Sequence, residues 1–294
     1  MEANYIVFSE GVNNIFFKKV ELKKIATGYF FTEGPVWDEV QDILFFTNFS
    51  DNTIHTWSEE KGTNVYRRNG NRAVGLSMDA TGKIVSAETR TRAITYAEET
   101  QSKIITDSYE GQRLNSPNDV VVKGDGDIFF TDPYSTAMGD TRELEFNGIF
   151  KVTPGGKSIL LADNLDRPNG LAFSPDESIL YVDDTNYQNI TAYHVREDNT
   201  LSEIGIFATL DTKYGTGAAD GMKVDEQGNV YLAGPGGIWV FDKNGSPVVI
   251  LQLPEPAGNL CFGGTDHKKL FITATSSVYM LQLKNPGIVP RRTI

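Results

Sequence analysis

Four side chains with oxygen donors stand directly before short apolar segments that recur along the chain. They are Glu33, Asn118, Asn169 and Asp220, in the stretches TEGPVWD, SPNDVVV, RPNGLAF and ADGMKVD. Carboxylate and amide oxygens are the ligands that hard divalent cations prefer. If the fold brings these side chains to one point, they predict a metal site. The ligand set favours Ca²⁺, and Mg²⁺, Mn²⁺, Zn²⁺ and Fe²⁺ remain alternatives.

A role in turns is the alternative interpretation of these residues. Asn-Gly and Asp-Gly pairs are common in turns, where the Asn or Asp side chain bonds the nearby backbone. The other two equivalent positions hold Val74 and, with a shift of one residue, Asn259. Oxygen donors at four of six equivalent positions favour the metal site. Two carboxylates in a narrow channel would repel each other, and a bound cation removes that repulsion.

A repeat of short strand-like segments must position these side chains. One segment of the repeat begins 40 to 52 residues after its predecessor, at Asp42, Gly82, Gly126, Ser178, Gly228 and Lys268. Further aromatic or β-branched segments flank it, so each unit reads as four short strands joined by turns. Six such units predict an all-β fold, a six-bladed β-propeller with four-stranded blades around a channel. Two β-sandwiches are the alternative, but sandwiches do not require a sixfold period.

The two ends of the chain are expected to meet in the last blade. The sixth unit lacks a fourth strand, and residues 21–27 (ELKKIAT) resemble the missing one. Pairing these segments would close the ring and leave few exposed edges. We therefore expect one domain over residues 1–294, with residues 1–20 as an N-terminal extension. The first strand of a propeller blade lines the channel, so the residues before it would share one channel mouth.

Composition and charge limit the partners. The formal net charge of −12 disfavours binding to nucleic acid or to an anionic membrane surface. Cys261 is the only cysteine, so no disulfide can form within the chain. The chain has no apolar run of about 18 residues, and its first residues are a poor signal peptide. We expect a cytoplasmic monomer with a small-molecule substrate and with neither nucleic-acid nor membrane partners.

The motifs also resemble those of a known family. The stretches FTEGPVWD, RLNSPNDVVV, FFTDPY, RPNGLAFSPD, ADGMKVDEQGNVYLAG and CFGGTDHKKLFIT occur in order between residues 27 and 283. Together they resemble the gluconolactonase, senescence-marker-protein and luciferin-regenerating-enzyme family, and its bacterial sugar lactonases most of all. The resemblance implies a six-bladed propeller with one divalent metal, held by Glu33, Asn169 and Asp220. It implies that Asn118 lies in the same site, on the metal, its water or the substrate.

The chain departs from the family pattern at two positions. Ser116 stands where the animal branch has an arginine, and Val74 where the family often has asparagine. Arg113, or Arg72 from the second unit, could supply the missing donor to the substrate. These departures concern the substrate rather than the metal.

The predicted activity is metal-dependent opening of a sugar lactone of the gluconolactone or xylonolactone type. A metal can polarise the carbonyl and activate water. Asp220 is the candidate general base, and water activated by the metal alone is the competing account. Asn118 and Asn115 are expected to donate hydrogen bonds to substrate, and Tyr134 to line the mouth or to pack. There is no G-x-S-x-G motif, which disfavours a covalent serine mechanism.

Two other functions fit the same residues. The same ligands could act on another electrophile, such as an organophosphate ester or a non-sugar lactone. The chain could also be a non-catalytic binding propeller whose metal is purely structural. An open side on the ring of oxygen ligands favours an enzyme, because a structural ion needs no open side.

Overall fold

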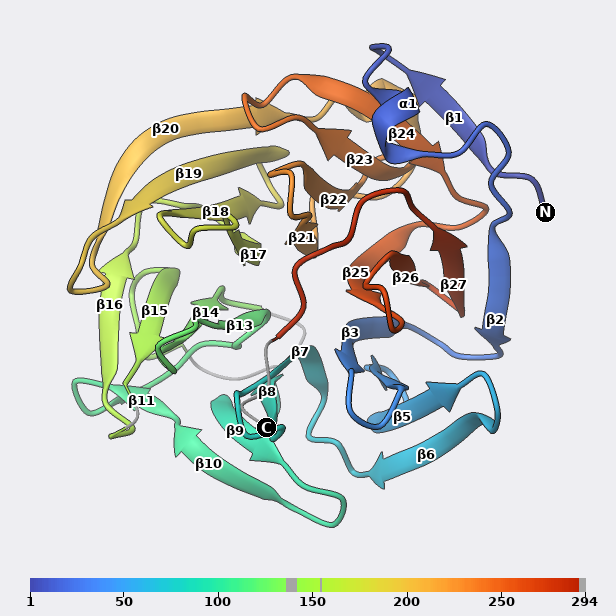
Figure 1. Cartoon of the computed structure of the whole chain (residues 1–294). Coiled ribbons are helices and arrows are strands. Elements are labelled where there is room, and N and C mark those ends of the chain that lie inside the picture. Colours follow the sequence, from blue (N-terminus) through green and yellow to red (C-terminus); the bar gives the residue numbers. More distant parts are fainter. Residues whose placement is uncertain (136–141, 154, 291–294) are drawn as a thin grey trace.

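Six antiparallel sheets surround a central channel in the computed structural model (Figure 1). The structure describes residues 1–135, 142–153 and 155–290. Blade 1 comprises β3 (Thr32–Asp38), β4 (Ile43–Asn48), β5 (Thr53–Ser58) and β6 (Gly62–Arg68). Blade 2 comprises β7 (Ala73–Met78), β8 (Ile84–Glu88), β9 (Ala93–Ala97) and β10 (Ser102–Thr106). Blade 3 comprises β13 (Val120–Val122), β14 (Ile128–Asp132), β15 (Gly148–Val152) and β16 (Ser158–Ala162).

The second half of the ring repeats this order. Blade 4 comprises β17 (Pro168–Phe173), β18 (Ile179–Asp184), β19 (Asn189–Val195) and β20 (Leu201–Thr209). Blade 5 contains β21 (Met222–Val224), β22 (Val230–Gly234), β23 (Gly237–Phe241) and β24 (Pro247–Gln252). Blade 6 contains β25 (Ala257–Gly263), β26 (Lys269–Ala274) and β27 (Ser277–Gln282). The predicted six-bladed propeller is confirmed.

The N-terminal segment contributes one strand to each of two blades. Strand β2 (Lys23–Thr27) is the outer strand of blade 6 and pairs Thr27 with Ser277 of β27. It lies within residues 21–27, the segment expected to supply this strand. Strand β1 (Asn4–Val7) adds a fifth strand to blade 5 by pairing with β24, and a single turn of helix, α1 (Val12–Ile15), follows it. Residues 1–20 are thus built into the fold.

Three further small elements of the described residues lie outside the blades. They are β11 (Ser108–Tyr109), β12 (Gln112–Arg113) and the 3₁₀ turn η2 (Thr212–Tyr214). The hairpin of β11 and β12 lies in the connection between blades 2 and 3. No helix of the described residues is long and apolar enough to cross a membrane.

The core lies between neighbouring blades. Each sheet is covered on both faces, and a strand buried on both faces reads as a nearly continuous apolar run rather than an alternating one. The segment IFFTD of β14 is buried at every position. Phe129 of that strand meets Phe173 of β17 edge to face, with ring centroids 5.0 Å apart. Such contacts hold blade 3 against blade 4 and so fix where each inner strand begins.

The C-terminal segment, residues 284–290, crosses the centre of the ring (Figure 1). Its Gly287 N–H donates to the His267 carbonyl at 2.8 Å, and its Ile288 N–H donates to Val224 at 3.1 Å. A Cβ at Gly287 would lie 1.7 Å from the Phe262 ring, so only glycine fits there. This segment borders the half of the channel that holds the ends of the inner strands.

We predict that β2 contributes more to stability than β1. Deleting residues 1–27 leaves the β27 edge unpaired, whereas deleting residues 1–7 removes only the extra strand of blade 5. The longer deletion is expected to lower Tm by more than about 10 °C or to cause aggregation. The shorter deletion is expected to lower Tm by only a few degrees. Thermal unfolding followed by circular dichroism compares them. Equal losses in the two variants would contradict the role given to β2.

Candidate functional site

The inner strands bring Glu33, Asn169 and Asp220 to one channel mouth, and Asn118 occupies the equivalent position before the inner strand of blade 3. Glu33 lies in β3 and Asn169 in β17, and both are buried, with 1% and 6% of their surface exposed. Asn118 and Asp220 stand just before β13 and β21 and are half-buried. The charge of Glu33 raises the pKa of Asp220, and the Asn169 side chain lowers it. Side chains from blades 1, 4 and 5 therefore interact across the channel.

Irregular pairing turns the first residues of the inner strands. In blade 1 the register between β3 and β4 shifts between Glu33 and Val36. In blade 4 the register between β17 and β18 shifts between Pro168 and Leu171. A bulge of this kind bends the strand and redirects a side chain. Each shift lies next to a predicted ligand, at the point where a regular strand would alternate its side chains between the two faces of the sheet.

Glycines that follow Asn169 and Asp220, together with Gly258 of blade 6, let the blades approach closely. A Cβ on Gly170 would lie 2.3 Å from the backbone oxygen of Asp220, and one on Gly221 would lie 2.0 Å from the Asn259 side chain. A Cβ on Gly258 would lie 2.3 Å from Glu33 Oε1. None of these three glycines has a positive φ. They are needed for close approach, and not for a left-handed turn.

Backbone hydrogen bonds correct the expected alignment in blade 6. The N–H of Gly75 donates to the Asn118 carbonyl, and the N–H of Gly221 donates to the Gly258 carbonyl, both at 2.8 Å. Because Gly75 and Gly221 occupy equivalent positions, Gly258 is the equivalent of Asn118. Asn259 then corresponds to Asp119, the residue after Asn118.

Threonines of the second strands hold the site residues in place. Thr131 donates to the Asn169 carbonyl at 2.7 Å, and Thr47 donates to the Val74 carbonyl at 3.1 Å. Thr185 accepts the Asn169 side-chain amide at 3.0 Å and donates to the Ala219 carbonyl at 2.9 Å. Thr185 thus fixes the orientation of the Asn169 amide through its nitrogen, which leaves the amide oxygen available to a ligand.

Two buried acids near the site were missed from sequence. Asp119 is 2% exposed, and its Oδ1 accepts the Val120 N–H at 2.9 Å. Asp183, in β18, is fully buried, and neither of its oxygens has a hydrogen bond of normal geometry to another described residue. The signal for Asp119 was its place directly after Asn118. Asp183 lies inside the segment SILYVDD. The apolar residues of this segment indicated a buried strand, and nothing in the pattern marked Asp183 as a site residue.

Burial and mutual repulsion raise the pKa values of the acids at the channel mouth. Burial raises the pKa of Glu33 to about 7. Burial, and then the charge of Glu33, raises the pKa of Asp220 well above its ordinary range. Burial, and then the charge of Asp220, does the same for Asp183. Lys223, whose Nζ donates to the Met222 carbonyl at 2.8 Å, lowers the pKa of Glu33 and of Asp119 but does not cancel the burial effect.

These residues fit a divalent cation of the calcium type. Two carboxylates and two amides meet the preference of hard cations for oxygen. The Asn118 side chain makes no hydrogen bond to another described residue and is free to act as a ligand. Within residues 1–135, 142–153 and 155–290, no three His, Cys, Asp or Glu side chains are grouped so as to hold a metal by themselves. A cation here would thus depend on amide oxygens as well as on Glu33 and Asp220.

The other predicted substrate-binding residues differ in whether their side-chain donors are already used in hydrogen bonds within the protein. Both hydrogens of the Asn115 amide are used, since its Nδ2 donates to the carbonyls of Asp132 and Phe146 at 3.2 and 2.8 Å. The Arg113 backbone N–H donates to Glu143, and the side chain is exposed, with a 3.5 Å contact to the Thr91 carbonyl. Tyr134 is half-buried beneath Arg142. Asn115 therefore holds the loop rather than offering a donor.

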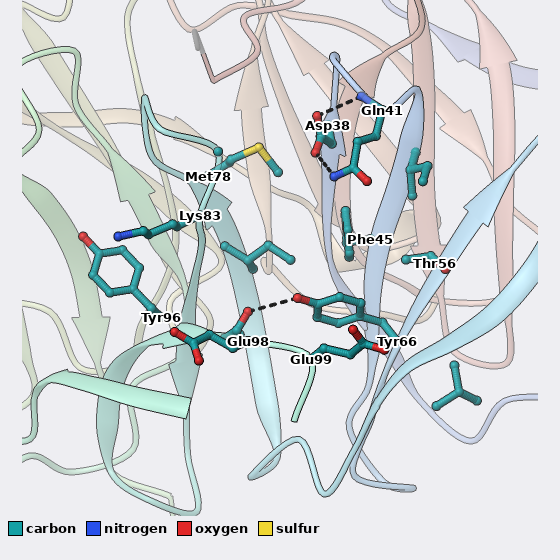
Figure 2. Close-up of a pocket in the computed structure, with 15 residues that line it drawn as sticks. Asp38, Gln41, Phe45, Thr56, Tyr66, Met78, Lys83, Tyr96, Glu98 and Glu99 are labelled. Atoms are coloured by element: carbon teal, nitrogen blue, oxygen red, sulfur yellow. Dashed lines mark hydrogen bonds between the residues drawn. The ribbon is translucent and has the colours of Figure 1, made fainter. Parts of the chain in front are cut away.

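Two cavities lie elsewhere. One of about 940 Å³ occupies the other half of the channel, beside the C-terminal segment, and includes Lys223 and Cys261. The second, of about 470 Å³, lies between blades 1 and 2, where Figure 2 shows Tyr66, Lys83 and Tyr96 around it. Neither is lined by the four predicted ligands. The channel mouth stays the candidate site because of the chemistry of its acids and amides, and not because of cavity size.

We predict that the ion-free protein loses stability as the pH rises from about 4.5 to about 7. Glu33 holds its proton in the folded state over this window, whereas the unfolded chain has released it. The share of Glu33 in this loss amounts to roughly 3 kcal/mol and is complete above the folded pKa, and the other buried acids with raised pKa add to it. Thermal unfolding in a chelator between pH 4 and 8 measures it. Glu33→Gln should reduce the slope by the share of Glu33, and an equally steep slope in that variant would contradict the assignment.

We predict that Gly258→Ala weakens cation binding while the fold persists. The new methyl group would collide with Glu33 Oε1 and displace that carboxylate. Disturbing a group that orients a ligand costs about 10- to 100-fold in metal affinity. Titration calorimetry with Ca²⁺ and Mn²⁺ measures the loss. Gly155→Ala is the matched control, because the nearest atom to its Cβ is 3.8 Å away. Unchanged affinity in Gly258→Ala would contradict the prediction.

Comparison with known proteins extends over nearly the whole ring. The chain is 30% identical to a gluconolactonase from Zymomonas mobilis over 95% of this chain and 86% of that protein. The structure of a gluconolactonase from Xanthomonas campestris superimposes with a TM-score of 0.86 at 31% identity, covering 94% of each chain. A calcium-binding regucalcin from Agrobacterium tumefaciens shares the fold, with a TM-score of 0.76 at 18% identity over 91% of this chain and 95% of that one.

The family model covers all four predicted ligands. The model for the SMP-30/gluconolactonase/LRE-like region matches residues 31–276, which extend from the start of β3 to the turn before β27. The expected resemblance is therefore confirmed, and this chain belongs to the SMP-30/gluconolactonase/LRE-like family.

Proposed function

We propose that this protein opens the ring of sugar lactones with the help of one divalent cation held by Glu33, Asn169, Asp220 and Asn118. The observation that supports this most is the meeting of the Glu33 and Asp220 carboxyls with the Asn169 amide at one channel mouth, where nearby cations do not offset the burial of the acids. The gluconolactonase relatives support the substrate class. The name of the regucalcin relative supports calcium as the ion.

The chemistry divides between the cation and the chain. When bound, a divalent cation polarises the lactone carbonyl and lowers the pKa of water. Glu33 and the Asn169 oxygen hold that cation from the buried side. Asp220 is half-exposed and can accept the proton of the attacking water, though a ligand role lowers its basicity. Asn118 has a free amide that can donate to the substrate carbonyl or ring hydroxyls.

The surroundings of the mouth shape the substrate site. Tyr134, with Arg142 5.3 Å from its ring centroid, offers a flat surface. Arg113 lies on the β11–β12 hairpin, and Asn115 fixes the loop that follows it. We propose Tyr134 and Arg113 as contacts to sugar hydroxyls, with Asn115 in a supporting role. Cytoplasmic location and a monomeric state stay predictions.

The test is lactone hydrolysis by metal-stripped protein with each cation restored. Gluconolactone, xylonolactone, a long-chain lactone and a phosphotriester are compared, with spontaneous hydrolysis subtracted. We expect turnover of the sugar lactones to return with Ca²⁺ or another divalent ion. Glu33→Gln, Asn169→Ala and Asp220→Ala should each lower kcat/KM by at least about 100-fold and reduce bound ion.

The control is Glu60→Gln, which removes one exposed carboxylate on blade 1 and should change nothing. No lactone hydrolysis with any cation would reject the enzyme proposal. Full activity after complete metal removal would reject the cation. Preference for the phosphotriester would move the substrate class to organophosphates.

A further inference from the structure

Arg167 is a positive charge on the rim of the acidic site. It directly precedes β17 and stands two residues before Asn169. Its backbone N–H donates to Asp184 Oδ2 at 3.3 Å, and its carbonyl accepts the Thr185 N–H at 3.1 Å. The side chain itself is exposed and has no hydrogen-bond or ion-pair partner among the described residues. A fixed backbone thus presents a guanidinium group that has no structural task.

The base of Arg167 is tied to the site by a shared residue. Thr185 contacts the Arg167 carbonyl through its backbone and the Asn169 amide through its hydroxyl. The guanidinium lies near enough to Asp220 to lower the pKa of that carboxyl. Its charge therefore reaches the group proposed to receive the proton of water.

Other arginines of this rim are engaged. Arg92 is buried, with its Nε on the Leu114 carbonyl and its Nη1 4.0 Å from Glu143. Arg142 lies over the Tyr134 ring and donates to Asn147. Arg167 differs from them because its side chain has no hydrogen-bond or ion-pair partner in the part of the chain that the structure describes, and because it lies close in sequence to the predicted ligand Asn169.

Lactone hydrolysis makes an anion in a place that disfavours anions. Water adds to the carbonyl carbon, the ring C–O bond breaks, and the ring oxygen takes up a proton as the alcohol. At neutral pH the new acid releases the other proton and becomes a carboxylate. Glu33, Asp119, Asp183 and Asp220 crowd this place, and the raised pKa of each carboxyl reflects how strongly it disfavours negative charge. A cationic side chain besides Lys223 would stabilise the product carboxylate there.

We propose that Arg167 binds the carboxylate that ring opening creates, as a further substrate-binding residue of this site. The proposal rests on the proposed lactonase function. Guanidinium groups pair with carboxylates through parallel N–H donors, which gives both strength and orientation. The same donors meet the carbonyl oxygen as it gains negative charge, before the ring opens.

The test compares an acid with its neutral analogue. Gluconate and the uncharged polyol sorbitol are titrated by calorimetry into protein loaded with the best-binding divalent cation. Arg167→Gln should weaken gluconate binding by about tenfold or more and leave sorbitol binding within about twofold. Arg167→Lys should restore part of the gluconate affinity. Arg196→Gln, an exposed arginine on the turn after β19, removes the same charge elsewhere and should leave gluconate binding unchanged.

Further readouts separate the possible failures. Bound cation is measured in every variant and should stay at the wild-type amount, because Arg167 is not a ligand. Gluconate affinity unchanged in Arg167→Gln, or equal loss for gluconate and sorbitol, would overturn the proposal. So would a wild-type protein that binds no gluconate. A wild-type protein that binds gluconate but hydrolyses no lactone would reject the lactonase function, while the Arg167→Gln titration would still decide the role of Arg167.

Discussion

The crowding of carboxylates at the channel mouth is the constraint on which the site depends. Glu33 and Asp220 come from blades that are far apart in sequence, and each raises the cost of ionising its neighbours. Water would normally relieve such repulsion, but burial of Glu33 and Asp183 excludes it. The protein keeps these groups together because six packed blades fix where the inner strands begin. Repulsion among these carboxylates therefore costs free energy, and a bound cation would lower that cost.

The fixing of the inner strands depends on backbone contacts at the mouth. Gly221 contacts the Asn259 side chain, and Gly258 contacts Glu33, at distances that leave no room for a Cβ. Threonine hydroxyls on the second strands then hold the carbonyls of Val74 and Asn169. Neighbouring blades thus position one another's predicted ligands. A substitution in one blade should therefore shift the position of a site side chain in the next blade.

Much of the fold could be predicted from sequence, because the strand segments repeat at a nearly regular spacing. The column of Glu33, Asn118, Asn169 and Asp220 followed from that repeat. The alignment was wrong by one residue in blade 6, because hydrophobic pattern alone cannot locate a bulge. Asp183 was missed for a related reason, since an acid within a buried strand gives no periodic signal. Strand β1 was missed because pairing with blade 5 depends on tertiary contacts.

The task of a given donor also could not be read from its type. Asn115 and Asn118 both looked like donors to substrate, yet the first spends its hydrogens on two carbonyls while the second keeps its amide free. Arg113 and Arg167 are both exposed, but the Arg113 guanidinium contacts the Thr91 carbonyl, whereas the Arg167 guanidinium lies near Asp220. Such distinctions come from the loops around the mouth, whose course is set by long-range packing.

The pairing of β2 with β27 also bears on how the chain reaches its native state. Thr27 and Ser277, which share a side-chain hydrogen bond, are separated by 250 residues. During synthesis the N-terminal strand emerges early and has no partner until nearly all of the chain has left the ribosome. Contacts of this range slow folding and leave an edge open to association meanwhile. Completion of the ring is thus a late event, and nascent chains should need protection until it occurs.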